Sequence, residues 1–251
     1  MISFTGSAET GEAIARKSGM LRLSLELGGK DPMIVLEDAD IDKAVKNAVS
    51  GAFSFAGERC TAVKRVLVHE RIAEQFVKKL VKETKKVKHG DPRKRDVIVG
   101  PLFDQPSADK VRSLIDDAVS KGAKIKCGGK NKGLYFEPTI LDAVTLDMQI
   151  AWIEQFGPVL PVIKIKDLDE AIKIANRSDY GLQADIFTKD INKAFYAGLK
   201  LEAGTIQING KSSRGPDHFP FGGVKHSGIG REGIKYAIEE MTQIKTIVVN
   251  L

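Results

Sequence analysis

One cysteine in the sequence lies in surroundings that suit a nucleophile. Cys60 follows a long apolar segment and stands in the run GERCT (residues 57–61), beside two charged residues and close to a glycine. The thiolate is the reactive form of cysteine, and a neighbouring guanidinium, here that of Arg59, favours the thiolate over the thiol. A buried structural cysteine is the usual alternative, but this charged setting favours a nucleophile. The second cysteine, Cys127, has no special partner, and we interpret it as structural.

A carboxylate at the end of an apolar strand is the second candidate for chemistry. Glu26 stands in LELGGK (residues 25–30), where alternating apolar residues run into two glycines. A solvated charge at a strand end is the ordinary interpretation. The alternative is a general base in a partly dry cleft, because a desolvated carboxyl has a raised pKa and can accept a proton near neutral pH. The residues alone leave both interpretations open.

Two further features could bind an anion. Gly6 and Gly11 form a GxxxxG pattern over a strand-to-helix turn, where backbone N–H groups at a helix start can hold phosphate. The pattern lacks the full dinucleotide fingerprint and the phosphate-loop lysine, so Gly6 could equally be a turn glycine. Arg214, in SRGP (residues 213–216), could bind an anion through two N–H groups or form a salt bridge. We expect no metal site, because the four histidines and two cysteines show no ligand spacing.

The composition bounds the class of protein. The chain has 251 residues, of which 42% are hydrophobic and 29% charged, which excludes a mostly disordered chain. No apolar run of about 18 residues exists, so we expect no membrane span. The net charge is +6, but aromatic residues do not interleave with the basic ones, so we expect no nucleic-acid partner. Two cysteines in a chain of this size indicate a reducing compartment, and we expect a cytoplasmic protein.

Strands and helices alternate along the chain and must position these residues. Asp40 is a plausible N-cap for a helix that begins at residue 41, and the alternation in residues 21–25 predicts a strand with one buried face. Residues 210–233 have too little periodicity for one element, and residues 245–249 form a β-rich tail. We expect strands over 2–4, 21–25, 33–36, 65–69, 124–127, 136–141, 159–165, 183–187 and 205–208, and helices over 8–17, 41–55, 72–86, 108–121, 168–176 and 192–199. Strands separated by helices form βαβ units, so we predict an α/β fold with a mainly parallel twisted sheet flanked by helices.

Six motifs together resemble the aldehyde dehydrogenase superfamily. They are FTGSAETG from residue 4, LELGGKDP from 25, GERCTA from 57, EQFGPVLP from 154, YGLQA from 180 and PFGGVKHSGIGREG from 220. They follow the order of the family, span nearly the whole chain, and include the 34-residue separation between Glu26 and Cys60. Within the family, the stretch from Asn209 to Gly228 looks most like the non-phosphorylating, NADP-dependent glyceraldehyde-3-phosphate dehydrogenases.

The resemblance implies catalytic roles for the first two candidates. Cys60 would attack the aldehyde to form a thiohemiacetal, and a hydride would pass to the nicotinamide of NADP or NAD, leaving a thioester. Glu26 would activate the water that hydrolyses the thioester. The backbone N–H of Cys60 would supply half of an oxyanion hole.

Binding roles follow from the same resemblance. Glu154 and Phe156 would position the nicotinamide ribose and ring, and the pyrophosphate would lie near Gly6, Ser7 and Gly11. The expected substrate is an aldehyde, with glyceraldehyde 3-phosphate as the candidate. The residues assigned to it are Arg59 and Arg214, for the phosphate, together with Thr61 and Phe221.

The resemblance covers only the C-terminal half of the family's length. We expect residues 1–24 to be the end of the cofactor-binding domain, 25–231 the catalytic domain, and 232–251 a C-terminal helix and oligomerisation tail. The implied partners are further copies of the chain, in a dimer or tetramer formed through the tail, and a separate chain that carries the N-terminal half. Two hypotheses remain: an aldehyde-oxidising enzyme, or a fragment that folds and oligomerises but does not bind cofactor by itself.

Overall fold

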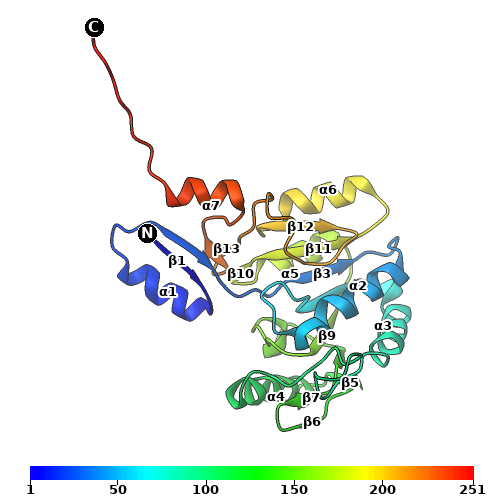
Figure 1. Cartoon of the computed structure of the whole chain (residues 1–251). Helices are drawn as coiled ribbons and strands as arrows, with labels where there is room; N and C mark the ends of the chain where they lie inside the picture. Colours follow the sequence, from blue (N-terminus) through cyan, green and yellow to red (C-terminus); the bar gives the residue numbers. More distant parts are fainter.

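Seven strands form the central sheet of the computed structural model, which describes residues 1–251 (Figure 1). The strand order is β12-β11-β3-β4-β9-β8-β5, and every neighbouring pair is parallel except β5 with β8. The expectation of a mainly parallel sheet is therefore confirmed. The strands are β3 (Pro32–Val35), β4 (Arg65–His69), β5 (Lys124–Cys127), β8 (Thr139–Asp142), β9 (Val159–Ile165), β11 (Gln183–Phe187) and β12 (Thr205–Ile208).

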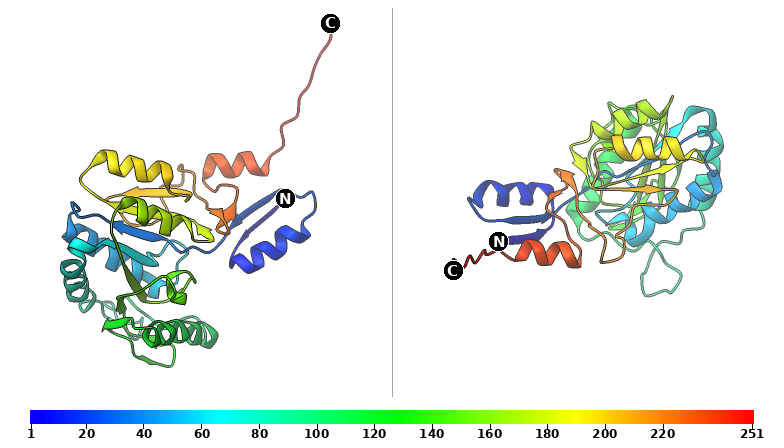
Figure 2. Two further views of the ribbon diagram at one scale, coloured as in Figure 1. Left: turned by 180° about the vertical axis from the view of Figure 1, so that it is seen from behind. Right: turned by 90° about the horizontal axis from the view of Figure 1, so that it is seen from above.

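Helices cover both faces of this sheet. The helices α2 (Ile41–Phe53) and α3 (Glu70–Thr84) pack together on one face, and α5 (Leu168–Asn176) and α6 (Ile191–Lys200) pack together on the other (Figures 1 and 2). The helix α4 (Gln105–Ser120) lies beyond β8 and β5. Because both faces are covered, the central strands are apolar on both sides, and one cluster of 49 buried residues forms the core. As expected, Asp40 caps α2 by accepting a hydrogen bond from the Lys43 N–H.

A small second sheet lies beside the central one (Figure 2). It contains β1 (Ile2–Thr5), β2 (Leu23–Glu26) and β14 (Gly228–Ile229), with α1 (Ala8–Lys17) connecting the parallel strands β1 and β2. The expected single buried face of residues 21–25 is wrong, because Ser24, Leu25 and Glu26 are all buried. The middle strand β2 is enclosed between α1 and the segment that ends in α7 (Ile234–Met241).

Two other expectations for strands need correction. Residues 136–141 form two strands, β7 (Tyr135–Phe136) and β8, separated by Pro138, which has no N–H to donate. Residues 245–249 are extended but pair with no strand, and the tail projects away from the body (Figure 1). The remaining short elements are β6 (Asn131–Lys132), β10 (Tyr180–Gly181), β13 (Val224–Lys225), and the 3-10 turns η1 (Ser54–Gly57) and η2 (Gln149–Ala151).

The structure has neither a membrane-spanning helix nor a cluster of metal-ligating side chains. None of the helices is both long and apolar enough to cross a bilayer. No group of three or more His, Cys, Asp or Glu side chains is arranged to hold a metal ion.

Candidate active site

A strained turn carries Cys60. After α2, Phe55, Ala56 and Gly57 have positive φ angles of 53°, 55° and 73°. A Cβ atom on Gly57 would lie 2.5 Å from the carbonyl oxygen of Gly157 and 2.8 Å from that of Ala52, so only glycine fits there. Consecutive left-handed residues persist only where surrounding contacts impose them, and such strain is common at functional sites. The turn reverses the chain and places Cys60 shortly before β4.

The environment of the Cys60 thiol opposes ionisation in the free protein. The side chain is half-buried, and this burial raises the pKa of the thiol, as does the carboxylate of Asp31. The Lys64 ammonium and a hydrogen bond from the Thr61 N–H lower the same pKa, but by less. The guanidinium of Arg59 donates instead to the Gly51 carbonyl, at 2.8 Å. Our expectation that Arg59 favours the thiolate therefore needs correction, because the guanidinium bonds elsewhere and burial raises the pKa of the thiol.

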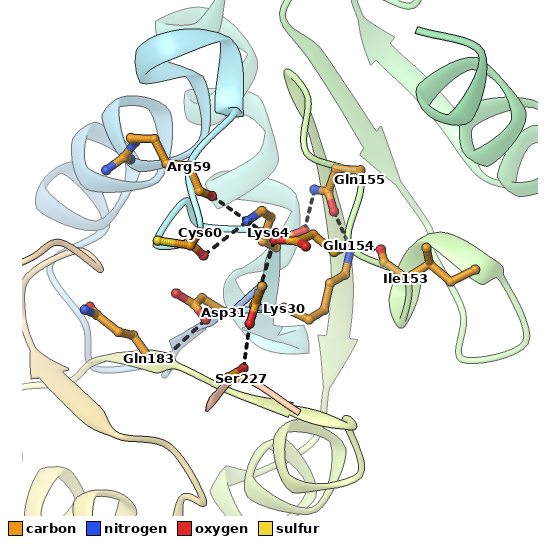
Figure 3. Close-up of polar contacts among 12 residues, drawn as sticks. Lys30, Asp31, Arg59, Cys60, Lys64, Ile153, Glu154, Gln155, Gln183 and Ser227 are labelled. Carbon is orange, nitrogen blue, oxygen red and sulfur yellow. Dashed lines mark hydrogen bonds and ion pairs between the residues drawn. The ribbon is translucent and has the colours of Figure 1, made fainter. Parts of the chain in front are cut away.

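The Lys64 side chain lies directly behind Cys60 (Figure 3). Its Nζ donates to the carbonyl oxygens of Arg59 at 2.7 Å and Cys60 at 3.2 Å, and to Oε1 of Glu154 at 3.0 Å. It also lies 5.4 Å from the centre of the Phe156 ring. We did not predict this residue from the sequence. The run AVKRV (residues 62–66) contains a signal that could have indicated it. Basic side chains within an apolar run that enters a buried strand are themselves buried, so they need hydrogen-bond acceptors inside the protein.

Glu154 connects the Cys60 turn to the strand end after Glu26. Its Oε1 accepts a hydrogen bond from the Gly29 N–H at 3.1 Å, in addition to that from Lys64. A Cβ atom on Gly28 would lie 2.4 Å from Oε2 of Glu154, and one on Gly29 would lie 3.0 Å from the Cys60 carbonyl oxygen. The two glycines thus permit this close approach. The Phe156 side chain remains 37% exposed and can contact a ligand.

Glu26 is buried and has no protein partner. Its side chain is 6% exposed, and neither carboxylate oxygen accepts a hydrogen bond. The pKa of Glu26 is raised to about 8, mainly by burial and next by Glu232, while Arg231 and Arg214 act in the opposite direction. Its Oε1 lies 2.7 Å from the position a Cβ atom of Gly222 would occupy. The interpretation of Glu26 as a solvated strand-end charge is therefore wrong, and the protonation behaviour is that of a general base near neutral pH.

Cys60 and Glu26 belong to one continuous stretch of contacts, although no hydrogen bond joins their side chains. Glu26 stands three residues before Gly29, whose α-carbon lies against the Cys60 carbonyl. A second series of contacts, through Leu182 and Gly204, also connects the Cys60 turn to Glu26. Leu182 contacts Gly29, and its carbonyl lies against Gly204, which in turn lies against the Gly222 backbone beside Glu26.

The two arginines assigned to a substrate phosphate lie in different environments. Arg59 is half-buried on the Cys60 turn. Arg214 forms ion pairs with Glu232 at 3.1 Å and Asp217 at 3.8 Å, and lies 5.5 Å from the Phe221 ring centre. No hydrogen bond or ion pair joins the two guanidinium groups to a common partner. Phe221 itself is buried, so contact with a substrate requires rearrangement around Arg214.

The turn before α1 uses its glycines for packing. A Cβ atom on Gly6 would meet the Phe4 ring at 2.4 Å, and one on Gly11 would meet Leu27 at 2.5 Å. The N–H groups of both glycines already donate, to the carbonyls of Glu26 and Ser7. Ser7 caps the helix by accepting from the Thr10 N–H at 3.2 Å. A phosphate would therefore approach the remaining N–H groups of the first turn of α1.

Further buried polar residues support these segments, and we predicted none of them. The Lys30 ammonium donates to the carbonyl of Ile153 at 2.8 Å and to the side chain of Gln155, which fixes the segment around Glu154. Asp185 accepts from the Ser212 hydroxyl at 2.7 Å and so holds the loop that leads to Arg214. Burial raises the pKa of Asp185 to about 7.

Fold and site together define an α/β protein in which a strained cysteine turn, a buried carboxyl and a helix N-terminus come from separate segments. The family model described as "Aldehyde dehydrogenase family" matches residues 1–247. The chain belongs to the aldehyde dehydrogenase family, and the resemblance of the six motifs is confirmed.

Two curated relatives show which members of the family this chain is similar to. The chain is 50% identical over 250 residues to the NADP-dependent glyceraldehyde-3-phosphate dehydrogenase of Pisum sativum, covering 100% of this chain and 50% of that protein. It is 48% identical over 249 residues to the lactaldehyde dehydrogenase of Methanococcus aeolicus, covering 99% of this chain and 53% of that protein. The chain thus spans about half the length of the curated relatives it matches.

A solved structure confirms the fold. The NADP-dependent glyceraldehyde-3-phosphate dehydrogenase of Bacillus halodurans, solved in complex with NADP, superposes with a TM-score of 0.95 at 51% identity. The match covers 97% of this chain and 51% of that one.

Proposed function

We propose that the chain carries the catalytic part of an NAD(P)-dependent aldehyde dehydrogenase, with Cys60 as nucleophile and Glu26 as general base. One observation carries the proposal. The Cys60 turn and the segment of Glu154 and Phe156 meet at the ammonium group of Lys64, and Oε1 of Glu154 joins them to Gly29, at the strand end that follows Glu26.

The first half of the reaction takes place at Cys60. The thiol loses its proton to solvent water, and the thiolate attacks the aldehyde carbon, so that the C=O π bond breaks and the oxyanion of a thiohemiacetal forms. The backbone N–H of Cys60 is the donor for the developing oxyanion. When bound, NAD(P)+ supplies the acceptor for the hydride that leaves this carbon, and a thioester remains on Cys60.

Glu26 performs the second half. Its carboxylate takes a proton from water, the hydroxide adds to the thioester carbon, and the Cys60 thiolate leaves as the carboxylic acid forms. With a pKa of about 8, a large share of Glu26 is protonated at pH 7, so the rate of this step rises with pH. No protein group donates a hydrogen bond to the Glu26 carboxylate, so its oxygens are free to accept one from the attacking water.

The residues present fit the cofactor. The open first-turn N–H groups of α1, next to Gly6 and Ser7, suit a pyrophosphate, while Gly11 packs beneath them. Glu154 lies beside the Cys60 turn with its Oε1 already bonded, and Phe156 presents an exposed ring there. The names of the matched glyceraldehyde-3-phosphate dehydrogenases support NADP rather than NAD.

A phosphorylated aldehyde is the proposed substrate, with glyceraldehyde 3-phosphate favoured over lactaldehyde. Arg59 and Arg214 would bind the phosphate, and Thr61 and Phe221 would line the same site. For this role Arg214 must exchange its ion pairs with Glu232 and Asp217 for the substrate. Comparing kcat/KM for glyceraldehyde 3-phosphate and lactaldehyde in Arg214→Leu tests this assignment. A selective loss for the phosphorylated aldehyde supports it, and an equal loss for both contradicts it.

The exposed tail is the proposed route to a homo-oligomer, a dimer or tetramer. Residues 242–251 project from the body and present the exposed side chains of Ile244, Ile247 and Val249. Light scattering coupled to gel filtration on a chain ending at Thr242 tests this: loss of the oligomer supports it. The free thiols Cys60 and Cys127 suit a reducing compartment such as the cytoplasm.

The second candidate function is a folded partner that associates with other chains and binds no cofactor by itself. Only one strand–helix–strand unit, β1–α1–β2, provides a candidate cofactor surface in these residues, which favours this alternative. A separate chain with the N-terminal half would then complete the enzyme. Isothermal titration with NADP distinguishes the two: micromolar binding by the chain alone contradicts the partner hypothesis.

Hydrolysis of an activated ester tests the proposed chemistry directly, since it needs the thiol and the base but no cofactor. We expect measurable turnover that Cys60→Ala abolishes. Cys127→Ala is the matched control and should retain turnover within about twofold, because Cys127 lies on β5, away from the site. Turnover that survives Cys60→Ala would overturn the proposal.

A further inference from the structure

We infer that Lys64 is a positioning residue, which aims the backbone N–H groups of the nucleophile turn and ties that turn to the cofactor-side segment. The inference deepens the proposed function and rests on Cys60 being the nucleophile. It assigns no contact between Lys64 and the substrate.

The hydrogen bonds of Lys64 leave no donor free. An ammonium group has three N–H donors, and the three acceptors are the carbonyls of Arg59 and Cys60 and Oε1 of Glu154. The side chain is 1% exposed. A buried charge with this complete set of partners fixes the relative positions of those partners.

The planarity of the peptide bond transmits this contact to the catalytic side. In a trans peptide, the C=O and N–H bonds point in opposite directions. The Arg59 carbonyl shares a peptide plane with the Cys60 N–H, and the Cys60 carbonyl shares one with the Thr61 N–H. By holding both carbonyls, Lys64 directs both N–H groups to the opposite side.

The sulfur lies on that opposite side. In Figure 3 the Cys60 carbonyl oxygen faces Lys64, while the sulfur points away from it. The Thr61 N–H is within hydrogen-bonding reach of the sulfur. The Cys60 N–H, the proposed oxyanion donor, belongs to the other peptide plane that Lys64 holds.

The third hydrogen bond of Lys64, to Oε1 of Glu154, fixes the segment that carries Glu154 and Phe156. Oε1 of Glu154 accepts from both Lys64 and the Gly29 N–H, so one oxygen atom joins three segments. The Phe156 ring, 5.4 Å from the ammonium, belongs to the same segment. Loss of Lys64 would therefore disturb the nucleophile and the proposed nicotinamide contacts together.

The pH at which the Cys60 thiol ionises provides a specific measurement for this inference, because it depends on the charges around the sulfur. The charged groups that act on the thiol are the carboxylates of Asp31 and Glu154, the ammonium of Lys64, and the neighbouring guanidinium of Arg59. Replacing Lys64 by methionine leaves both carboxylates and removes the ammonium that lowers the pKa of the thiol. The thiol should then ionise at higher pH.

Lys30 provides a matched control. It is also a buried lysine, 2% exposed, and its Nζ donates to the Ile153 carbonyl and Gln155. It makes no hydrogen bond to the Cys60 turn. Lys30→Met should therefore cost stability without changing the reactivity of the thiol.

The test is the rate of alkylation of Cys60 by iodoacetamide between pH 6 and 10, in a Cys127→Ser background. We expect Lys64→Met to shift the profile to higher pH and to slow alkylation about tenfold at pH 7.5, which corresponds to about one pKa unit. Lys64→Arg keeps the charge and the N–H donors and should restore the rate to within about threefold. Lys30→Met should stay within about twofold of the parent while unfolding at a lower temperature.

Each possible result either supports or contradicts the positioning role of Lys64. A Lys64→Met profile that superposes on the parent, or one that Lys30→Met reproduces, would overturn the inference and leave the proposed function standing. If Lys64→Met does not fold, Lys64→Gln, which keeps two N–H donors, carries the same prediction for the pH profile. Parent Cys60 that shows no alkylation and no ester turnover would overturn the proposed function as well.

Discussion

The Lys64 cluster, comprising Lys64, Glu154 and the carbonyls of Arg59 and Cys60, differs sharply from the surroundings of Glu26. In the Lys64 cluster every N–H of a buried ammonium has an acceptor. Around Glu26, a buried carboxyl has no donor on either oxygen. Both groups are nearly inaccessible, so burial alone does not distinguish them.

The difference teaches how one site uses buried charge in two ways. Complete pairing fixes geometry, because any movement leaves a charge or a polar group unpaired. Absence of pairing leaves protonation variable, because no hydrogen bond holds the charged form against the cost of burial. A pocket of about 390 Å³ is lined by residues that include Ser24, Arg214 and Glu232, and Glu26 is buried behind this lining. Arg214 and Glu232, which line this pocket, both act on the pKa of Glu26, so its protonation depends on groups that solvent can reach.

The largest expected effect tests the unpaired side of this comparison. Glu26→Gln keeps the shape of the side chain but cannot accept a proton, so we expect hydrolysis of the acyl-enzyme to slow about 10²–10⁴-fold. In the parent, the hydrolysis rate should rise with pH through about 8 and then level, since the base acts only when deprotonated. Single-turnover kinetics with an activated ester from pH 6 to 9 measure both. A parent rate that is flat with pH would contradict the role of Glu26.

Asp185 is an intermediate case, because one oxygen is paired with Ser212 and the other has no partner. Its pKa rises from an ordinary value in the unfolded chain to about 7 in the fold. A carboxyl with a raised pKa contributes stability below its unfolded pKa, and this contribution is lost as pH rises through about 7. A pKa shift of this size corresponds to a change of about 4 kcal/mol in the free energy of unfolding.

Asp185→Asn should remove that pH dependence. Urea unfolding of the parent should show the free energy of unfolding falling between pH 5 and 8, after allowance for the parallel titration of Glu26. In Asp185→Asn the fall should be smaller, so that the variant gains on the parent as pH rises. Equal pH dependence in both proteins would show that Asp185 is not protonated in the fold.

A smaller effect tests the geometry of the nucleophile turn. Gly57→Ala places a methyl group 2.5 Å from the Gly157 carbonyl at a positive φ angle, and we expect a loss of about 3 kcal/mol. Gly133→Ala is the control, because its φ of 56° carries the backbone penalty but nothing lies within 4 Å. Its loss should be about 1 kcal/mol. Similar losses in the two variants, measured by urea unfolding, would mean that close packing against Gly157 does not hold the turn.

Much of the fold follows from local pattern. The strands at 65–69, 124–127, 159–165, 183–187 and 205–208 have the predicted bounds. Those at 65–69, 159–165 and 183–187 are almost wholly buried, and a short apolar run between helices leaves little freedom of assignment. The strand β2 was predicted, but its single buried face was wrong because its second face is also covered. The break between β7 and β8 was missed, and it falls at Pro138, which has no N–H to donate. The tail after α7 has β-rich residues but no strand to pair with in this chain.

The candidate site was only partly predictable. Cys60 and Glu26 stand out by residue type and neighbours, and the burial of Glu26 agrees with its interpretation as a base. The contacts of Lys64, Lys30 and Asp185 depend on segments more than 80 residues away or on a loop without periodicity, which no local pattern encodes. The expected ionisation of Cys60 was wrong because burial raises the pKa of the thiol, and the neighbouring residues in the sequence do not reveal that burial.

The most direct test of shared chemistry at Cys60 and Glu26 is the intact mass of the chain after reaction with p-nitrophenyl acetate. In Glu26→Gln, we predict one acetyl group that persists on Cys60, located by peptide mapping, whereas the parent releases it within the same time. An acetyl group that leaves Cys60 equally fast in both proteins, or that attaches elsewhere in the chain, would contradict the pairing of this thiol with this carboxyl.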